Sequence, residues 1–158
     1  MPIRTAVVPA ADILQLRWTV LRPGLPRESA VFPEDDAPGA YHLAAYDPDG
    51  VVRGCASFSP EQLPGDGDGH AAPPAIRLRG MASDPAVRGQ GYGTAVLDAG
   101  LAEAAARGAG VAWCNARTEA VGFYEAHGWE IRGEEFHIEG VGPHYVMVRK
   151  LGTVPARP

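Results

Sequence analysis

The chain is poor in lysine and cysteine. Among its 158 residues the only lysine is Lys150, and the two cysteines are Cys55 and Cys114. Two isolated cysteines are too few for a disulfide framework and favour a reducing, cytoplasmic setting. The sequence has no apolar run of the roughly 18 residues that a membrane span needs. It also lacks the charged, apolar and cleavage regions that follow one another in a signal peptide. We therefore expect neither a membrane partner nor export.

Positive charge is scarce as well. Lysine and arginine number 14 against 19 acidic residues, which gives a net charge of −5, and no basic run is present. Binding to nucleic acid by neutralising phosphates is therefore not expected. The acidic loop at 66–69 begins like a calcium loop. His70 and Ala71 stand where such a loop requires other residues, and no closing glutamate follows, so no metal is expected.

The hydrophobic pattern predicts a mixed sheet with three helices. Four prolines make 23–40 irregular, a natural place for an acceptor-binding loop. A hairpin is antiparallel and a strand–helix–strand crossover is parallel, so both kinds of pairing are expected. Strands are expected at 3–8, 41–46, 51–58, 75–83, 111–116, 129–138 and 144–151, and helices at 9–22, 92–107 and 118–127, with Thr118 as an N-cap. The first helix has an apolar stripe of Leu14, Trp18 and Leu21, with Ile13, Leu16 and Val20 beside it. The buried side of the second helix is expected at Val96, Leu97, Leu101 and Ala105.

A glycine-rich turn precedes the second helix. It reads Arg88-Gly89-Gln90-Gly91-Tyr92-Gly93-Thr94. Alternate glycines remove side chains, so backbone N–H groups can approach an anion, and the following helix N-terminus favours negative charge. A P-loop is excluded because no lysine stands in this turn, and a dinucleotide motif is excluded because Thr94 stands at its third glycine. What remains is a phosphate cradle of the form Arg-x-x-Gly-x-Gly, or a glycine turn with no ligand.

A second block, residues 113–129, places a strand before a helix of the form Ala-x-x-Phe-Tyr-Glu-x-x-Gly-aromatic. The two blocks, in this order, resemble motifs A and B of the GCN5-related N-acetyltransferases (GNATs). The resemblance implies an α/β fold, the acyl-CoA N-acyltransferase fold. Its central mixed sheet is splayed between strands four and five and carries helices on both faces. A single domain over 1–151 and a flexible tail over 152–158 are expected.

The resemblance also implies acetyl-CoA as cosubstrate, with the pantetheine arm in the gap between 75–83 and 111–116. By position, the glycine turn would hold the pyrophosphate, the end of strand four would face the thioester, and Asn115 would reach the pantetheine amides. The residues implied in coenzyme binding are Met81, Ala82, Ser83, Arg88, Gly89, Gln90, Gly91, Tyr92, Gly93, Thr94, Asn115, Phe123 and Tyr124.

The closing segment narrows the resemblance. Phe136-His137-Ile138-Glu139 followed by Pro143-His144-Tyr145-Val146-Met147 is similar to the tail of small bacterial ElaA- and YjcF-like GNATs. In those relatives Gly-Ile tends to precede Pro-His, whereas this chain has Val141-Gly142 there.

The chemistry of acetyl transfer suggests roles for three side chains. An alkylammonium has a pKa of about 10.4, so a base must remove its proton near pH 7. Tyr124 is expected to protonate the leaving thiolate. Many relatives use a glutamate from strand four as base, but Arg77 and Arg79 occupy that strand here. Glu139 and His144 are therefore the candidate bases.

Other polar groups have alternative interpretations. Arg77 and Arg79 are candidates to bind an acceptor carboxylate or phosphate, or are solvated strand residues. His42 and His137 are expected to be satisfied, partly buried histidines. Cys114 could act as a covalent nucleophile, but a cysteine within an apolar strand is far more often inert.

The sequence thus predicts an N-acetyltransferase that passes the acetyl group directly to a primary amine in a ternary complex. The alternative is a non-catalytic GNAT-fold module that binds CoA or serves in regulation. The acceptor is expected to be a small-molecule or peptide amine, with a weak preference for a cationic one because the chain is acidic. A homodimer built on the C-terminal strands is compatible with this pattern.

Overall fold

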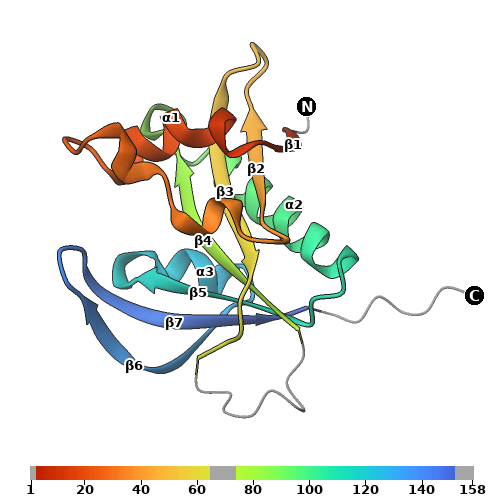
Figure 1. Ribbon diagram of the computed structural model, residues 1–158, viewed down its shortest axis with the longest axis vertical. Helices are drawn as coiled ribbons and strands as arrows, with labels where there is room; N and C mark the ends of the chain where they lie inside the picture. Colours follow the sequence, from red (N-terminus) through yellow and green to blue (C-terminus); the bar gives the residue numbers. More distant parts are fainter. Residues whose placement is uncertain (1–2, 65–73, 152–158) are drawn as a thin grey trace, which may run out of the picture. The chain divides into compact units, whose positions relative to one another are not determined.

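The computed structural model describes residues 3–64 and 74–151 (Figure 1). These residues form a seven-stranded sheet in the order β1-β2-β3-β4-β5-β7-β6. Only β4 and β5 pair in parallel among the registers described. The strands are β1 Arg4–Val8, β2 Tyr41–Tyr46, β3 Val52–Pro60, β4 Ala75–Ser83, β5 Val111–Arg117, β6 Glu130–Ile138 and β7 Gly142–Lys150. The α-helices are α1 Ala10–Leu21, α2 Tyr92–Ala106 and α3 Val121–Ala126, and the 3-10 helices are η1 Arg27–Ala30, η2 Pro33–Asp36, η3 Pro85–Val87 and η4 Thr118–Ala120. The predicted mixed sheet is confirmed.

The chain divides into two compact units. Unit 1 comprises Met1–Pro60 and Leu78–Glu103, and unit 2 comprises Glu61–Arg77 and Ala104–Pro158. The single domain expected over 1–151 stays a prediction. The expected tail at 152–158 and the acidic loop at 66–69 lie outside the described residues.

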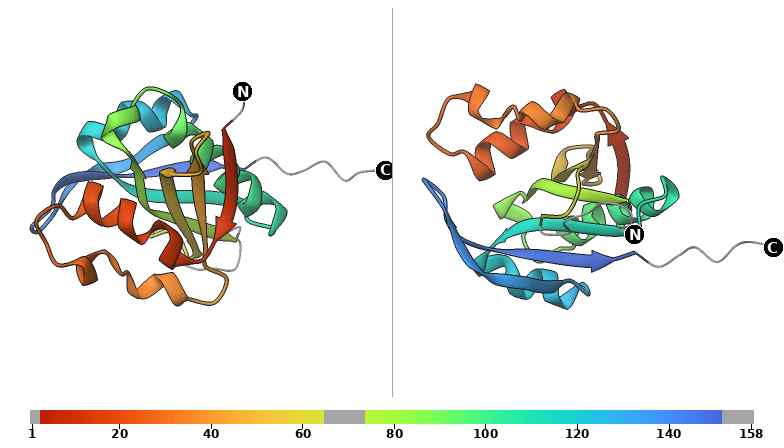
Figure 2. Two further views of the ribbon diagram at one scale, coloured as in Figure 1. Left: turned by 90° about the horizontal axis from the view of Figure 1, so that it is seen from above. Right: turned by 60° about the horizontal axis from the view of Figure 1, so that its bottom comes forward.

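In unit 1 the two helices α1 and α2 cover opposite faces of β2 and β3 (Figure 2). Ile13 and Leu16 of α1 pack with Ala44 and Cys55. On the other face, Phe58 packs against Gly100 of α2, where an added Cβ would lie 2.1 Å from the ring. Successive residues of a strand point to opposite faces, so β3 serves both helices at once.

The N-terminus of α2 also lies close to β3. A Cβ added to Gly54 would lie 2.9 Å from the backbone oxygen of Tyr92. The Tyr41 hydroxyl donates a hydrogen bond to the Gly100 carbonyl at 2.8 Å, and its ring stacks on Phe58 at 5.1 Å. Two glycines, one in β3 and one in α2, therefore set how close this helix comes to the sheet.

The buried stripes differ from those predicted. In α1, Leu14 and Trp18 are only half-buried, whereas Arg17 is fully buried. In α2, Leu101 and Ala105 are half-buried, and the closest packing is made by Val96, Leu97, Gly100 and Ala104. The predicted stripe is wrong in α1, whose buried residues are Ile13, Leu16 and Arg17, whereas in α2 the prediction is confirmed for Val96 and Leu97 and wrong for Leu101 and Ala105. A prediction from hydrophobic periodicity places only apolar side chains in the core. Here Arg17, which has buried partners, and Gly100, which lies under an aromatic ring, occupy core positions.

In unit 2, β5 pairs with β7 and β7 with β6, all antiparallel. The parallel pairing of β4 with β5 runs from Ala75↔Val111 to Arg77↔Trp113. The core of this unit gathers around Trp113, whose Nε1–H donates to the Glu61 carbonyl at 2.9 Å. The splay expected after Arg77 stays a prediction, because the rest of β4 belongs to unit 1.

The third helix begins differently from the prediction. Thr118 opens the 3-10 turn η4, and its hydroxyl donates to Glu135 of β6 at 2.7 Å instead of capping the helix. The N-cap residue of α3 is Ala120, which makes no side-chain capping bond. The N-cap assigned to Thr118 is therefore wrong, because a cross-strand carboxylate engages the hydroxyl.

Candidate active site

The glycine turn has the backbone of an anion-binding loop. Gly89 and Gly91 have φ values of +82° and +97°, in the region that favours glycine. Residues 88–91 are exposed. The first bond within α2 runs from the Ala95 N–H to the Gly91 carbonyl at 2.9 Å. Helix geometry therefore gives the N–H groups of Tyr92 and Gly93 no carbonyl within α2, so they are placed to meet an anion.

One residue of β4 has a left-handed backbone conformation. Gly80 has a φ of +61° within the strand. An added Cβ would lie 3.0 Å from both the Arg17 side chain and the Phe32 ring, so only glycine fits. Met81 and Ser83 are half-buried, and Ala82 joins the core against α1. The strand nevertheless continues to Ser83 and includes the segment expected to face the thioester.

Arg17 is a fully buried arginine that the sequence did not single out. Its guanidinium pairs with both carboxylate oxygens of Asp35, at 2.7 and 3.0 Å, and donates to the Ala30 carbonyl at 2.8 Å. It also donates to the Ser57 hydroxyl and lies 4.0 Å from the centre of the Phe32 ring. Charge-assisted and bidentate bonds of this kind are strong, so Arg17 fixes the irregular segment 27–36 onto the sheet.

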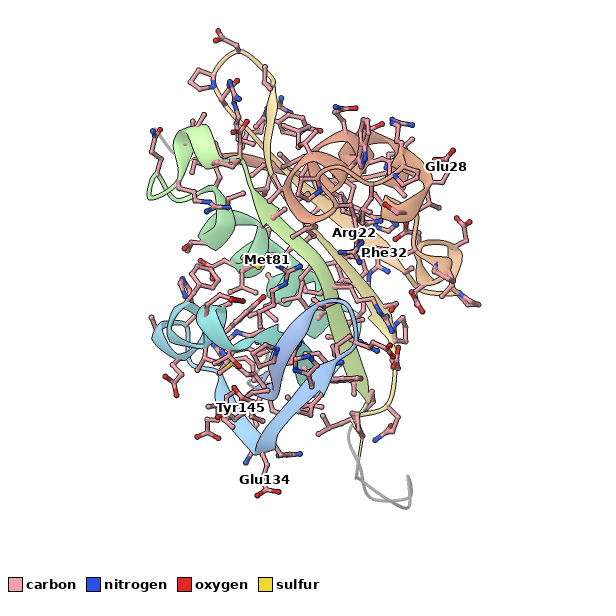
Figure 3. The ribbon with its side chains drawn as sticks, turned by 90° about the vertical axis from the view of Figure 1, so that its left-hand side faces the viewer. Arg22, Glu28, Phe32, Met81, Glu134 and Tyr145 are labelled. Carbon is pink, nitrogen blue, oxygen red and sulfur yellow. The ribbon has the colours of Figure 1, made fainter. Side chains whose placement is uncertain are left out.

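The segment held by Arg17 carries a further aromatic contact. Figure 3 shows Arg22 beside Phe32, and the guanidinium carbon lies 5.5 Å from the ring centre. Phe32 therefore has arginines near it from two positions of α1. The prolines of 23–40 indicated an irregular segment, but nothing in the spacing indicated that α1 would hold it.

His42 is satisfied, as predicted. Its Nδ1 lies 2.7 Å from the Ser57 hydroxyl and its Nε2 3.2 Å from the Asp35 carbonyl. Ser57 accepts from Arg17, so its own proton can go to Nδ1, and the Nε2–H of the neutral ring then donates to the carbonyl. Both ring nitrogens of this buried histidine are engaged. His137, by contrast, is exposed, so the prediction that it is partly buried is wrong.

A pocket with room for about one water molecule lies within unit 1 and shares Asp35, His42 and Ser57 with this network. The Arg79 guanidinium donates to Ser59 at 3.0 Å and lies 3.7 Å from the Glu34 carboxylate, which is 40% exposed. The pocket therefore presents one carboxylate and one guanidinium above buried hydroxyls. Its lining residues are Glu34, Asp35, His42, Ser57, Phe58, Ser59 and Arg79.

Arg77 has a structural role instead. Its guanidinium donates to the Glu61 carboxylate at 2.9 Å and lies 4.6 Å from the Trp113 ring centre. Arg77 and Arg79 are two residues apart and share a face of β4, but they have different partners, since those of Arg79 are in unit 1. Of the two arginines considered for acceptor binding, only Arg79 lines the pocket.

In unit 2, Tyr124 lies against Cys114. The Tyr124 side chain is 8% exposed and packs edge-on to Phe123 and Trp129 at 5.3 and 5.2 Å. Burial, together with the neighbouring Cys114 thiol, raises the pKa of Tyr124 well above its usual range. Burial also raises the pKa of Cys114 to about 12, so its thiol is protonated and a poor nucleophile near neutral pH. This opposes the covalent alternative.

The remaining coenzyme candidates in unit 2 differ in exposure. Phe123 is 36% exposed and contacts the His127 ring at 4.5 Å. Asn115 is half-buried on β5, where its neighbour across the strands is Val146. Because side chains alternate along a strand, Asn115 lies on the face of β5 opposite Cys114.

The two candidate bases occupy different environments. Glu139 is exposed in the turn between β6 and β7. His144 is 4% exposed, faces the Phe136 ring at 5.9 Å, and places Nδ1 2.7 Å from the Gly142 carbonyl. Because that carbonyl can only accept, Nδ1 carries the proton and Nε2 of the neutral ring keeps its lone pair. His144 thus has the tautomer of a potential base.

Comparison with known proteins decides the family. The sequence profile of the acetyltransferase (GNAT) family matches residues 10–129. The uncharacterized N-acetyltransferase YitI of Bacillus subtilis (strain 168) is 34% identical over 151 residues, which cover 96% of this chain and 98% of YitI. The chain belongs to the acetyltransferase (GNAT) family. It is an N-acetyltransferase that depends on acetyl-CoA.

Solved structures of other GNAT-type proteins share the fold. Escherichia coli ElaA aligns with a TM-score of 0.72 at 19% identity, covering 94% of this chain and 100% of ElaA. The GNAT family N-acetyltransferase YhbS of Escherichia coli, solved in complex with CoA, aligns with a TM-score of 0.70 at 20% identity. That alignment covers 95% of this chain and 82% of YhbS. The resemblance to ElaA predicted from the closing segment therefore extends to the fold.

Two further properties concern the described residues only. Over 3–64 and 74–151, no group of three or more histidine, cysteine, aspartate or glutamate side chains is placed to hold a metal ion. No helix in the same part of this GNAT chain combines the length and apolar character needed to cross a membrane.

Proposed function

We propose that this GNAT enzyme transfers the acetyl group of acetyl-CoA directly to a primary amine, in a ternary complex. The observation that carries the proposal is the exposed turn of Gly89 and Gly91, with positive φ angles, at the N-terminus of α2. Such a turn suits a coenzyme diphosphate because its N–H groups can converge on the phosphate oxygens. The CoA complex of YhbS, a structural neighbour, supports the same coenzyme.

The coenzyme assignments follow the resemblance stated above. The turn from Arg88 to Thr94 would bind the diphosphate, and the main chain of Met81–Ser83 would face the thioester. Asn115 would bind the pantetheine amides.

Tyr124, which lies next to Phe123, would assist departure of the CoA thiolate. An ordinary thiol has a pKa of about 8.5. The pKa of Tyr124 lies far above this, so complete proton transfer from its hydroxyl to the thiolate would be uphill. The role that fits best is a hydrogen bond donated to the developing thiolate. Hydrogen bonds to charged groups contribute about 1.5–3 kcal/mol, so Tyr124→Phe should lower kcat roughly 10- to 100-fold.

His144 or Glu139 would take the amine proton. His144 is favoured by its Nε2 lone pair, which the bond from Nδ1 to Gly142 leaves in place. Glu139 is favoured by its exposure in the β6–β7 turn, where an acceptor can reach it. His144→Gln and Glu139→Gln separate the two, because loss of the base removes the acidic limb of the pH profile of kcat/KM.

The acceptor would be a small-molecule or peptide amine. The chain has a net charge of −5, which favours a cationic acceptor. The same net charge disfavours nucleic acid as a partner. A cytoplasmic location and a homodimer through the C-terminal strands complete the proposal.

The decisive experiment mixes the protein with acetyl-CoA and a panel of amines and follows free thiol. The panel should contain a polyamine, an aminoglycoside, a lysine peptide and a peptide with a free N-terminus. Thiol release that requires an amine supports direct transfer. Binding of acetyl-CoA by calorimetry without thiol release from any acceptor would favour the non-catalytic module. Acetylation of Cys114 in the absence of acceptor would support the covalent route instead.

A further inference from the structure

We propose that Arg53 is a positioning residue for the coenzyme's diphosphate, acting through Asp84, and that it links the β2–β3 hairpin turn to the glycine turn. The inference rests on the proposed function, since it concerns how the glycine turn is held ready for the coenzyme. Arg53 has no place in either GNAT motif identified in the sequence. All residues involved belong to unit 1.

The Arg53 guanidinium bridges two carboxylates that are far apart in the sequence. Its Nε donates to Asp47 at 2.8 Å and its Nη1 to Asp84 at 2.7 Å. The backbone adds a third link, because the Asp84 N–H donates to the Arg53 carbonyl at 2.8 Å. One side chain and one peptide group of β3 therefore fix the position of Asp84.

Each carboxylate in turn organises its own loop. Asp47 accepts from the N–H groups of Asp49 and Val51, at 2.8 and 3.0 Å, which closes the hairpin turn. Asp84 accepts from the Ala86 N–H at 2.9 Å at the start of η3. Arg53 thus binds two carboxylates that are already held by main-chain donors.

Main-chain hydrogen bonds connect Asp84 to the glycine turn. The Val87 N–H donates to the Asp84 carbonyl at 3.0 Å, and the Gln90 N–H donates to the Val87 carbonyl at 3.2 Å. The same short path therefore leads from Arg53 to the peptide between the two glycines. Pre-organising a binding loop in this way strengthens binding, because less conformational freedom is lost when the ligand arrives.

Electrostatics distinguishes positioning from simple charge attraction. Main-chain donors and Arg53 lower the pKa of both Asp47 and Asp84, so both are ionised near neutral pH. The cluster of these two carboxylates and Arg53 carries one net negative charge. If it acted on an anionic coenzyme only through its field, removing one carboxylate would tighten binding. If Asp84 and Arg53 position the turn, the same change weakens binding.

The test measures binding of acetyl-CoA by calorimetry to wild type, Asp84→Asn and Asp47→Asn. Asparagine keeps an acceptor oxygen for the main-chain donors but loses the ion pair with Arg53. We expect the Kd for acetyl-CoA to rise about fivefold in each variant. This is the factor expected if the glycine turn has its binding-competent conformation in about one-fifth of the molecules. The matched control is Asp49→Asn, which removes the same charge from the same hairpin turn, where Asp49 is exposed. Its Kd should stay unchanged or fall.

A second measurement separates positioning from general destabilisation. S-acetylpantetheine lacks the diphosphate, so its KM with a working amine should not respond to Asp84→Asn, whereas the KM for acetyl-CoA should rise with little change in kcat. Arg53→Lys keeps the charge and one bond and should bind acetyl-CoA with an intermediate Kd. Equal or lower Kd values in Asp84→Asn and Asp47→Asn, with wild type binding normally, would overturn this inference alone. Failure of wild type to bind acetyl-CoA would overturn the proposed function and this inference with it.

Discussion

Replacing Gly100 by alanine tests how α2 is seated on the sheet. The new Cβ would lie 2.1 Å from the Phe58 ring, where ordinary contacts begin at 3.4 Å. The ring cannot move aside easily, since it is 1% exposed and stacked on Tyr41. Overpacking of this kind costs about 1–3 kcal/mol, and we expect the upper end here. Alanine has a higher helix propensity than glycine, which offsets about 1 kcal/mol of this cost. The net loss should be about 2 kcal/mol.

Thermal unfolding checks this value. For a chain of this size, 1 kcal/mol corresponds to about 2–4 °C, so Tm should fall by about 4–8 °C. The matched control is Gly122→Ala in α3, where nothing lies within 4 Å of the new Cβ, and where Tm should rise slightly. Phe58→Leu should reduce the cost of Gly100→Ala, which a double-mutant cycle measures. A Gly100→Ala protein as stable as wild type would refute the reasoning.

Three further predictions concern buried or paired groups. Burial raises the pKa of both Cys55 and Cys114 to about 12, so neither should react with iodoacetamide at pH 8 until the protein unfolds, and mass spectrometry showing rapid native labelling would contradict this. The pKa of Asp47 is lowered, so its stabilisation is present above the unfolded value of about 3.9 and is lost as pH falls through the folded value. Asp47→Asn should therefore have a lower Tm than wild type at pH 7 and the same Tm in strong acid, and a constant difference would argue against the ion pair. Arg17→Met leaves Asp35 without its partner and should cost about 3–5 kcal/mol in denaturant unfolding, with part recovered by adding Asp35→Asn.

The strands and the two motif blocks could be predicted from the sequence because their signals are local. The fourth strand was predicted at 75–83, where the structure has it, since its pattern is local and the break at Asp84-Pro85 follows directly. The glycine turn could also be recognised from its spacing, although the positive φ angles of Gly89 and Gly91 were seen only in the structure. Motif spacing was also sufficient for the family, which a matched profile and a relative 34% identical now establish.

The polar pairs could not be predicted in the same way. Arg17 and Asp35 are 18 residues apart, and Arg53 and Asp84 are 31 apart. No periodicity relates such positions, because only the sheet brings β3 and the end of β4 to the same place. In the sequence, an arginine among apolar helix residues argues against burial of that position. Only a known partner in the structure explains why the arginine is buried.

By itself, the sequence determined the order of strands and helices, the glycine-rich turn before α2 and membership of the GNAT family, since each depends on residues close together in the chain. Only the tertiary structure decided that Arg17 lies in the core, that Arg79 rather than Arg77 lines the pocket of unit 1, and that Arg53 joins two turns. Those outcomes depend on which charged side chains are paired in buried or partly buried positions. Burying an ion is unfavourable unless a partner is in place, and the partners here come from distant segments that folding alone brings together.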